Sequence, residues 1–364
     1  MHLEQRQRAQ DWLKQHGFEQ ALFSAPATVT WLTGLAPAVQ VGPSPFAGGP
    51  PLVWYAGGTF TLVVPDSLAE AAGRAGCPVV TYPAYAYETP VASVAQLAAI
   101  VRGLTDNARG RLGAEQHALP AHLWPAGAVP LDGQLDDLRL VKTAAELAVL
   151  RRNFALTDIG HAAGRRAVRV GQREIDVWTA VQSAIEQAAG ERVVLGNDCV
   201  VGGRENNSGG WPGDLPLRAG DALILDLGTR VGGYWSDSCG TYFADAPTDR
   251  QAAVYRVVRE ALELAVALIR PGAVAAAIDA EVRAFIRAAG YPVYAHHTGH
   301  GVGVTAHEEV RITPYNQRAL AAGMVLMLEP GVYFPGEFGV RLEDAVLVTA
   351  AGAEVLTHHA KTLP

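Results

Sequence analysis

The amino-acid sequence predicts a two-domain protein of the α+β class, in which a smaller α/β domain precedes a larger domain of helices and β-hairpins. Its 364 residues exceed what a single hydrophobic core normally organises. Apolar residues make up 49% of the chain and charged residues 18%, which is typical of a globular protein. Helix-like and strand-like segments alternate up to about residue 136, and long helices interleaved with hairpins follow.

The first domain, residues 1–136, is predicted to be an α/β layer domain. Its apolar periodicity predicts, in order, a helix at 4–16, strands at 20–24 and 59–64, a helix at 66–75 and a strand at 78–82. Residues 36–58 are rich in Gly, Pro and Ala, and so long an irregular stretch is typical of a functional loop. A surface excursion without fixed structure is an equally good interpretation.

The second domain is predicted to cover residues 137–364. Its first helix follows the linker-like segment 127–138, with Thr143 as the N-cap and Glu146 as its capping-box partner. The same periodicity predicts helices at 173–189, 248–270 and 274–289, and strands at 222–228, 233–243, 324–333 and 340–348. Helices interleaved with hairpins favour an α+β domain over a doubly wound parallel sheet.

Charge and composition argue against several kinds of partner. The net charge of −7 argues against nucleic acid or an anionic membrane as the main partner. No signal-peptide core or run of about 18 apolar residues occurs, so we expect a cytoplasmic protein. Cys77, Cys199 and Cys239 form neither a C-x-x-C pair nor an even set, which argues against a disulfide framework or a structural zinc knuckle.

The run DLGTRVGGYWSDSCG, residues 226–240, carries an aspartate on each side of a Gly-rich turn. With the turn centred between Val231 and Gly232, Asp226 and Asp237 would face each other across antiparallel strands, with Cβ atoms about 4.5–5.5 Å apart. Their neighbours are apolar, and burying two unpaired carboxylates is costly. We therefore expect a positive group between them.

A second hairpin near the C-terminus repeats this construction. VLMLEPGVYF contains Glu329, VRLEDAVLV contains Glu343, and Gly336 lies midway between them. Between the two hairpins, glycines flank His300 in TGHGVG. Taken singly, such residues are usually surface or turn residues, but acids inside apolar runs are rarely buried without a partner. Four carboxylates and an imidazole suit two divalent cations with a shared water, and manganese, cobalt and zinc all fit.

In DLG-x7-SD, TGHGVG, LEPG and GVRLED the sequence resembles the pita-bread metallopeptidases, which include methionine aminopeptidases, Xaa-Pro aminopeptidases and Xaa-Pro dipeptidases (prolidases). The resemblance covers about residues 140–364, and TVTWLTG is similar to a signature of the creatinase/prolidase N-terminal domain. It implies a C-terminal pita-bread domain, a smaller creatinase-like α/β domain, a homodimer and two divalent metal ions. The metal ligands that it implies are Asp226, Asp237, His300, Glu329 and Glu343.

The same resemblance implies further site residues. His307 and His296 match histidines that flank the metal centre, and Arg311 and Arg341 match arginines near the substrate site. An imidazole such as that of His307 would hydrogen-bond the scissile amide or carry a proton. For His296 and His297, packing around the site or at the surface is the alternative. Asp344 would either orient a ligand residue or face solvent.

Three positions depart from the family pattern. Gly209 stands where proline peptidases usually carry a histidine, Val310 replaces the proline of H-E-x-P, and Gly240 replaces the arginine of S-D-x-x-R-T. No implied metal ligand is changed. We therefore expect the chemistry to be kept and recognition of the far end of the substrate to be rebuilt, with three candidates: Trp211, Tyr294 and the 36–58 loop.

The predicted function is hydrolysis of the bond between an N-terminal residue and proline in small peptides. A shared water would attack the peptide carbonyl, with Glu329 taking its proton and passing it to the leaving nitrogen. Arg311 and the 36–58 loop would neutralise a nearby carboxylate and exclude longer chains, which favours an Xaa-Pro dipeptidase. An Xaa-Pro aminopeptidase is the alternative; a metal-free creatinase-like or binding protein is less favoured because the ligand set is intact. The native metal, the residue before proline and the physiological substrate stay open.

Overall fold

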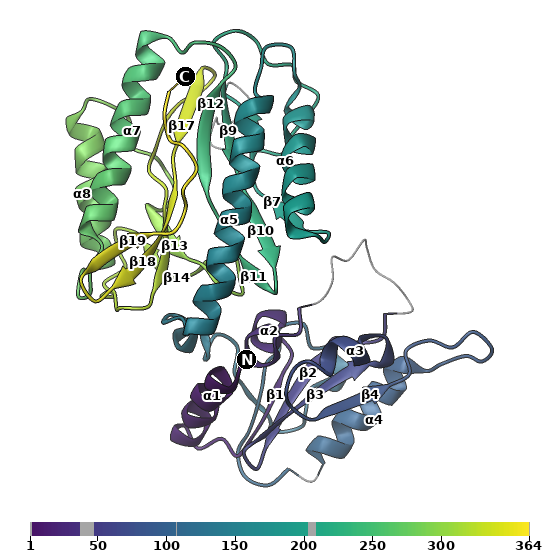
Figure 1. Cartoon of the computed structure of the whole chain (residues 1–364). Coiled ribbons are helices and arrows are strands. Elements are labelled where there is room, and N and C mark those ends of the chain that lie inside the picture. Colours follow the sequence, from purple (N-terminus) through teal and green to yellow (C-terminus); the bar gives the residue numbers. More distant parts are fainter. Residues whose placement is uncertain (1, 37–46, 107, 203–208, 364) are drawn as a thin grey trace. The chain divides into compact units, whose positions relative to one another are not determined.

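A computed structural model describes residues 2–36, 47–106, 108–202 and 209–363. The chain divides into two compact units, Met1–Arg139 and Leu140–Pro364 (Figure 1). The boundary predicted from the sequence, between residues 136 and 137, lies inside the 3-10 helix η3 (Asp136–Arg139), and it stays a prediction. None of the described helices combines the length and apolar character needed to cross a bilayer.

The first unit is built on a mixed six-stranded sheet. Its strand order is β4-β3-β2-β1-β5-β6, with β1, β2 and β3 antiparallel and the outer pairs parallel. The strands are β1 (Gln20–Phe23), β2 (Leu52–Ala56), β3 (Thr59–Pro65), β4 (Val79–Tyr82), β5 (Leu112–Ala114) and β6 (Val129–Pro130). The helices are α1 (Leu3–Gln15), α2 (Pro26–Thr33), η1 (Asp66–Leu68), α3 (Ala69–Ala72), α4 (Ser93–Thr105) and η2 (Ala121–Leu123). Both layers supply the core, with Leu22 and Trp54 from strands packing near Leu97 of α4.

Strand β2 corrects the prediction of one irregular stretch over 36–58. Leu52 and Val53 are fully buried, and β2 pairs with both β1 and β3. The apolar run of β2 is only five residues long. The Gly and Pro residues around it make the whole stretch look irregular in the sequence. Gly57 and Gly58, both at positive φ, form the two-residue turn into β3. Residues 37–46 lie outside the described residues, so the capping role of this loop stays a prediction.

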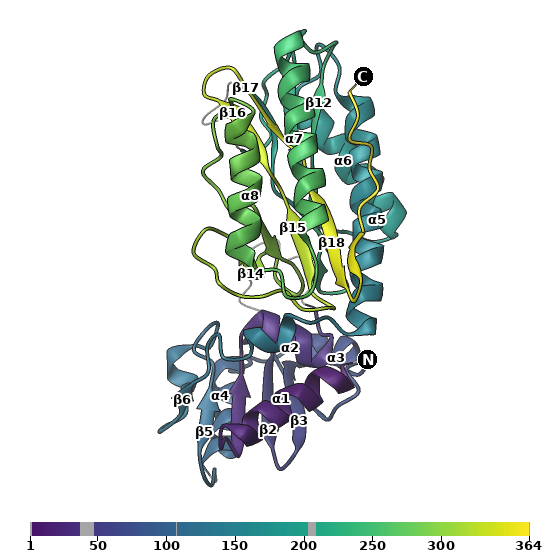
Figure 2. The ribbon, with the colours of Figure 1, turned by 90° about the vertical axis from the view of Figure 1, so that its left-hand side faces the viewer.

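The second unit places strands between two helix pairs. Helices α5 (Ala144–Ala167) and α6 (Glu174–Ala189) lie on one side, and α7 (Asp249–Leu268) and α8 (Ala275–Ala288) on the other (Figures 1 and 2). The shorter strands are β7 (Val194–Gly196), β8 (Cys199–Val201), β10 (Gly228–Val231), β11 (Tyr234–Trp235), β13 (Gly299–Gly301) and β19 (Gly352–Val355). The others are β9 (Ala222–Asp226), β12 (Cys239–Phe243), β14 (Glu308–Ile312), β15 (Val325–Leu328), β16 (Gly331–Phe334), β17 (Phe338–Arg341) and β18 (Asp344–Thr349).

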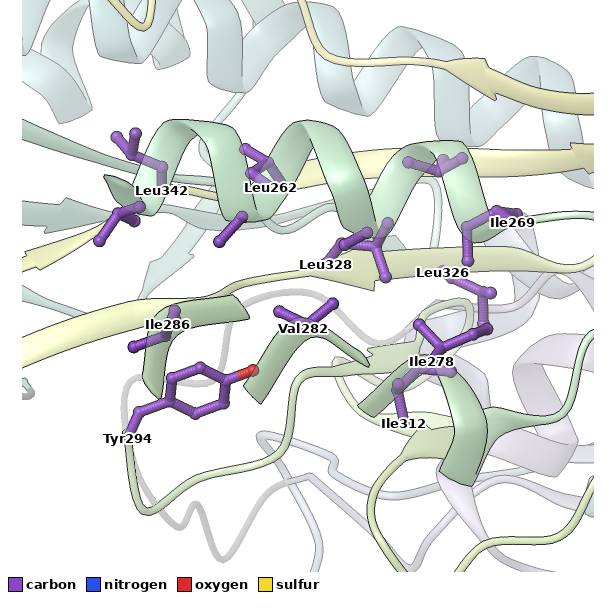
Figure 3. Close-up of a cluster of buried hydrophobic side chains, with 14 of the residues drawn as sticks. Leu262, Ile269, Ile278, Val282, Ile286, Tyr294, Ile312, Leu326, Leu328 and Leu342 are labelled. Atoms are coloured by element: carbon purple, nitrogen blue, oxygen red, sulfur yellow. The ribbon is translucent and has the colours of Figure 1, made fainter. Parts of the chain in front are cut away.

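The hydrophobic core fixes these strands against the helices. On one side, Leu262 of α7 and Val282 of α8 pack against Leu328 of β15 (Figure 3). On the other, Val181 of α6 packs against Leu225 of β9. All five side chains are buried, and each contributes about 1.5–3 kcal/mol relative to an exposed one. Strand β9 is therefore anchored by α6, and strand β15 by α7 and α8. Both strands end at or beside candidate ligands.

The start of helix α5 confirms the predicted capping box. Thr143 Oγ1 accepts a hydrogen bond from the Glu146 amide, and the Glu146 carboxylate accepts one from the Thr143 amide at 2.9 Å. Thr143 is 4% exposed, so water cannot easily replace these bonds. The box satisfies two of the amides that a helix N-terminus leaves unpaired.

We expect Thr143→Ala to lower the free energy of unfolding by about 1 kcal/mol, because the N-cap hydrogen bond is lost at a buried position. Urea denaturation measures this. The control is Thr179→Ala on the exposed face of α6, where the hydroxyl donates only to the preceding turn at Ile175. Equal losses in the two variants would show that the cap contributes nothing.

Candidate metal centre

The first hairpin has a different register from the predicted one. Val231 pairs with Tyr234 and Asp226 pairs with Cys239, so the turn residues are Gly232 and Gly233. Both have positive φ, as a two-residue turn that matches the strand twist requires. The prediction that Asp226 and Asp237 are directly opposite is therefore wrong. Asp237 instead lies two residues along the strand from the position opposite Asp226, a diagonal arrangement that keeps both side chains on one face.

The second hairpin has the predicted register. Leu328 pairs with Asp344 and Gly331 pairs with Arg341, which brackets Glu329 opposite Glu343 and centres the turn on Gly336. The Glu343 amide also donates to the Cys239 carbonyl. This contact between Glu343 and β12 ties the two hairpins together.

His300 lies on β13, between β14 and β15. A Cβ atom on Gly299 would lie 2.0 Å from the Met327 carbonyl oxygen, and one on Gly301 would lie 2.2 Å from that of Glu309. The flanking glycines therefore let three strands approach closely. His300 Nδ1 lies 2.8 Å from the Gly301 carbonyl oxygen and donates to it, which leaves Nε2 as an acceptor or metal ligand.

The structure brings all five predicted ligand residues together. His300 Nε2 lies 3.6 Å from Asp237 Oδ2 and 3.7 Å from Glu329 Oε1. Ligand atoms of Asp237, His300 and Glu343 all lie within 4.8 Å of one another. Asp226 joins them through Asn197, whose Nδ2 donates to carboxylate oxygens of both aspartates, at 3.2 Å for Asp226 and 2.9 Å for Asp237. All five side chains line a cavity of about 700 Å³.

The donor set fits divalent cations. Asp226, Asp237, His300, Glu329 and Glu343 are each at most 9% exposed. Both carboxylate oxygens of Glu343 are buried, and neither accepts a hydrogen bond from the described residues. Buried carboxylates without donors are costly unless a cation binds them. Oxygen ligands with one imidazole suit manganese, cobalt or zinc.

The pKa values of two of the acids are raised because both are buried and their negative charges lie close together. Burial raises the pKa of the Asp237 carboxyl well above its usual range, and the Asp226 charge raises it further. Burial likewise raises the pKa of the Glu343 carboxyl, helped by the charges of Asp237 and Asp226. Burial also opposes ionisation of Glu329, but the hydrogen bond from His297 and nearby positive charges outweigh it and lower its pKa to about 2. Burial lowers the pKa of His300 to about 3, so it is neutral at pH 7.

We expect the buried carboxyls of the metal-free site to stabilise the protein less as the pH rises. A carboxyl whose pKa is raised on folding stabilises the fold below its unfolded pKa of about 4, and this contribution is lost as the pH climbs through the raised value. Asp237 and Glu343 both shift in this direction. Buried histidines such as His300, whose pKa is lowered, change the stability in the opposite sense over this range, so the carboxyl effect is measured against a variant that lacks one carboxyl. Between pH 5 and pH 8 the melting temperature of the chelator-treated wild type should fall relative to that of Asp237→Asn, and manganese should reduce this difference.

Asp237→Asn is the reference for this titration because it removes one of the two carboxyls and leaves the histidines in place. An equal pH dependence of the melting temperature in the metal-free wild type and in Asp237→Asn would contradict the assignment of strained carboxyls to this site.

His296, His297 and His300 surround Glu329, and His307 lies beside His300. His297 Nε2 lies 2.8 Å from Glu329 Oε1, and His296 Nδ1 lies 3.8 Å from Oε2. The His307 ring centre lies 4.1 Å from that of His300, and burial lowers the pKa of both His307 and His296. The three residues predicted to be catalytic, Glu329, His296 and His307, thus line the cavity. For His297, packing around the site or at the surface was the alternative expected from the sequence. Its imidazole makes the closest of these contacts to Glu329.

The two predicted substrate arginines differ in position. Arg341 is buried, and its Nη2 donates to Asp226 Oδ2 at 2.7 Å and to Asp198 Oδ2 at 2.6 Å. Its guanidinium is therefore committed to acids at the centre. Arg311 is exposed on β14 and does not line the cavity. The structure brings Arg341 to the ligands and leaves Arg311 outside, so a substrate role for either stays a prediction.

Asn197 and Asp198, between β7 and β8, were not predicted as site residues. Asn197 has φ of +84°, a conformation that asparagine tolerates better than most residues. The burial of Asp198, together with the Asp226 charge, raises the pKa of its carboxyl. A Cβ on Gly209 would lie 2.4 Å from Asp198 Oδ2, so a histidine there would displace this aspartate. The polar pair Asn-Asp in VLGNDCVV was the sequence signal for these two residues.

Of the two single residues expected to replace the missing histidine in substrate recognition, one lines the cavity and the other does not. Tyr294 is buried and lines the cavity, whereas Trp211 is 73% exposed and does not line it. Asp344 was expected either to orient a ligand residue or to face solvent. Its carboxylate accepts hydrogen bonds from Thr357 and Lys361. It therefore holds the C-terminal segment rather than facing solvent freely.

Comparison with known proteins gives the family and the fold. Residues 148–350 match metallopeptidase family M24, and residues 5–152 match the creatinase/prolidase N-terminal domain. The Xaa-Pro dipeptidase of Pyrococcus furiosus is 34% identical over 228 residues, which are 62% of this chain and 66% of that protein. A probable dipeptidase PepE of Mycobacterium tuberculosis is 37% identical over 220 residues, 59% of this chain and 58% of that protein. The matched stretch thus spans less than two thirds of the length of each relative.

The solved structures agree over a longer stretch. A crystal structure described as the prolidase from Pyrococcus horikoshii superposes with a TM-score of 0.84 at 25% identity, covering 99% of this chain and 100% of that one. The predicted fold, a creatinase-like α/β domain followed by a pita-bread domain, is thereby confirmed.

Proposed function

The chain belongs to metallopeptidase family M24, and on this premise we propose that it hydrolyses the bond between an N-terminal residue and proline, most readily in Xaa-Pro dipeptides. Family membership implies a dinuclear metal site. We propose that two divalent cations, manganese, zinc or cobalt, are held by Asp226, Asp237, His300, Glu329 and Glu343. The observation that carries this proposal is the convergence of these buried side chains on one cavity, in which neither oxygen of Glu343 accepts a hydrogen bond from the part of the chain that the structure describes.

Bound metals would lower the pKa of a water and stabilise negative charge on the attacked carbonyl oxygen. The residues of the chain would do the rest. Glu329 is ionised and held by His297 at 2.8 Å, so its carboxylate would accept the proton of the water and pass it to the leaving nitrogen. His307 lines the cavity beside His300 and would hydrogen-bond the scissile amide. His296, held by the Tyr333 hydroxyl at 2.8 Å, would orient Glu329 from its other side.

Support for a dipeptide substrate comes from the relatives and from the cavity. The Pyrococcus furiosus relative is named as an Xaa-Pro dipeptidase. A cavity of about 700 Å³ accepts a ligand of small-peptide size. We also propose the homodimer and the two-domain division that the family resemblance implies.

One observation favours the second candidate, an Xaa-Pro aminopeptidase acting on longer peptides. A dipeptidase must neutralise the carboxylate of its substrate close to the scissile bond. Among the described residues that line the cavity, Arg341 is the one basic residue besides histidines, and it is bound to Asp226 and Asp198. A cationic partner for a dipeptide carboxylate would therefore be a histidine or a residue outside the described lining.

The test compares kcat/KM for a Xaa-Pro dipeptide, a Xaa-Pro-Xaa tripeptide and a Xaa-Ala dipeptide, with manganese present. We expect the Xaa-Pro dipeptide to be favoured by at least about tenfold over each of the others. Preference for the tripeptide would support the aminopeptidase. Failure of the metal-loaded protein to cleave any of the three would contradict a proline peptidase.

A further inference from the structure

A second cavity, of about 560 Å³, lies in the second unit, apart from the metal centre. The C-terminal end of α5, strand β12 and residues 359–362 form its walls. Figure 2 shows the C-terminal segment running beside α5. Hydrogen bonds fix this placement: the Asp158 carboxylate accepts from the amides of His358 and His359, and Arg165 donates to Thr362 Oγ1.

Arginines dominate the charge of this cavity. Arg165 and Arg166, in the last turn of α5, and Arg169, just beyond its end, all line it. No acidic side chain among the described residues forms an ion pair with any of them, although the chain as a whole carries a net charge of −7. Asp245, the one acid in the described lining, accepts a hydrogen bond from its neighbour's amide.

The helix end explains only part of this cluster. Arg169 donates to the carbonyls of Arg165 and Val168, so it caps the C-terminus of α5, where positive charge is favourable. Arg165 lies in the last turn of α5 and Arg169 lies two residues beyond its end, so their like charges repel at this end of the helix. Arg166 is exposed at the same rim. An anion between them would relieve this repulsion.

The rest of the lining is polar and aromatic. The rings of His161 and His359 stack with their centres 3.9 Å apart, and both residues are buried. The Tyr242 hydroxyl lies 3.0 Å from His161 Nδ1, which fixes this wall. The Nε2 atom of His359 is buried and has no hydrogen-bond partner among the described residues. His359 Nε2 could therefore make one more hydrogen bond. The cavity volume is larger than a bare inorganic ion needs.

We propose that this cavity binds a small phosphorylated molecule, with its phosphate group among Arg165, Arg166 and Arg169. Guanidinium groups bind phosphate oxygens through paired, charge-assisted hydrogen bonds. A cluster of three cations favours a dianionic phosphate over a single carboxylate because it balances more charge. Tyr242 and Phe243 of β12 line the same cavity and would contact the remainder of the ligand.

The test uses inorganic sulfate as the probe, a tetrahedral dianion that binds divalent metals weakly. Calorimetric titration of the metal-loaded full chain, at constant ionic strength, should show saturable binding to the wild type. Arg166→Gln should weaken that binding about tenfold, the loss of one charge-assisted hydrogen bond. Arg287→Gln, an exposed arginine of α8 that does not line the cavity, is the matched control and should bind as the wild type does.

Three results would overturn the proposal. Absence of saturable binding, or equal affinities of the Arg166 and Arg287 variants, would show that the arginines do not form a site. Acetate binding as tightly as sulfate would mean a carboxylate site instead. Loss of sulfate binding in Glu329→Gln would place the anion at the metal centre. Because Arg166 is exposed, its variant should keep the wild-type melting temperature, which separates lost binding from lost folding.

Discussion

Glu329→Gln should lower kcat/KM for a Xaa-Pro dipeptide by about 1,000-fold or more and reduce the metal bound per chain. The carboxylate is both a proposed ligand and the proposed proton acceptor. The neutral amide of glutamine cannot accept the proton and binds a divalent cation more weakly. The substitution preserves shape and can still contact His297, which lies 2.8 Å from the carboxylate. Steady-state kinetics and elemental analysis of the purified variant measure the two effects.

The matched control for this variant is Glu337→Gln in the turn of the same hairpin. Glu337 is exposed and pairs with Arg250 at the surface. Its replacement should change kcat/KM less than about twofold, because Glu337 does not line the cavity. The loss of its exposed ion pair should also cost at most about 1 kcal/mol of stability. A Glu329 variant with near wild-type activity would contradict the proposed mechanism.

Arg341→Gln should destabilise the metal-free protein by about 3 kcal/mol. The guanidinium is 5% exposed and donates to both Asp198 and Asp226, so its loss leaves two acids without their cation. Removing one member of a buried ion pair typically costs about 3–5 kcal/mol. Urea denaturation in the presence of a chelator measures the effect.

Arg250→Gln is the control for Arg341→Gln, because Arg250 forms an exposed ion pair with Glu337 and should cost less than about 1 kcal/mol. Manganese should recover part of the stability lost in the Arg341 variant, since a cation beside Asp226 replaces the missing charge. Equal losses in the Arg341 and Arg250 variants would show that the buried contacts of Arg341 are not needed for folding.

The long elements of the fold were predictable from the sequence because their signals are local. The helix predicted at 173–189 is α6 (Glu174–Ala189), and the helix after Thr143 begins where its capping box places it. Strands such as β7, β8 and β13 were not predicted, because each has three residues and shows no measurable period. Strand β2 was hidden for a similar reason inside a Gly- and Pro-rich stretch.

The candidate site was predictable as far as hairpin symmetry and family motifs extend. The second hairpin has the predicted register, whereas the first is shifted because Gly232 and Gly233 together occupy the turn. The contact between Asp198 and Arg341 joins residues 143 positions apart, and no local pattern signals it. For the same reason the sequence did not indicate that Asn197 bridges Asp226 and Asp237.

The central claim is that two hairpins and β13 hold a pair of divalent cations. Anomalous diffraction at the manganese absorption edge, from crystals of the manganese-loaded protein, tests it most directly. We expect two anomalous peaks per chain, bounded by Asp226, Asp237, His300, Glu329 and Glu343. A cavity without two such peaks, or peaks bound by other residues, would contradict the claim.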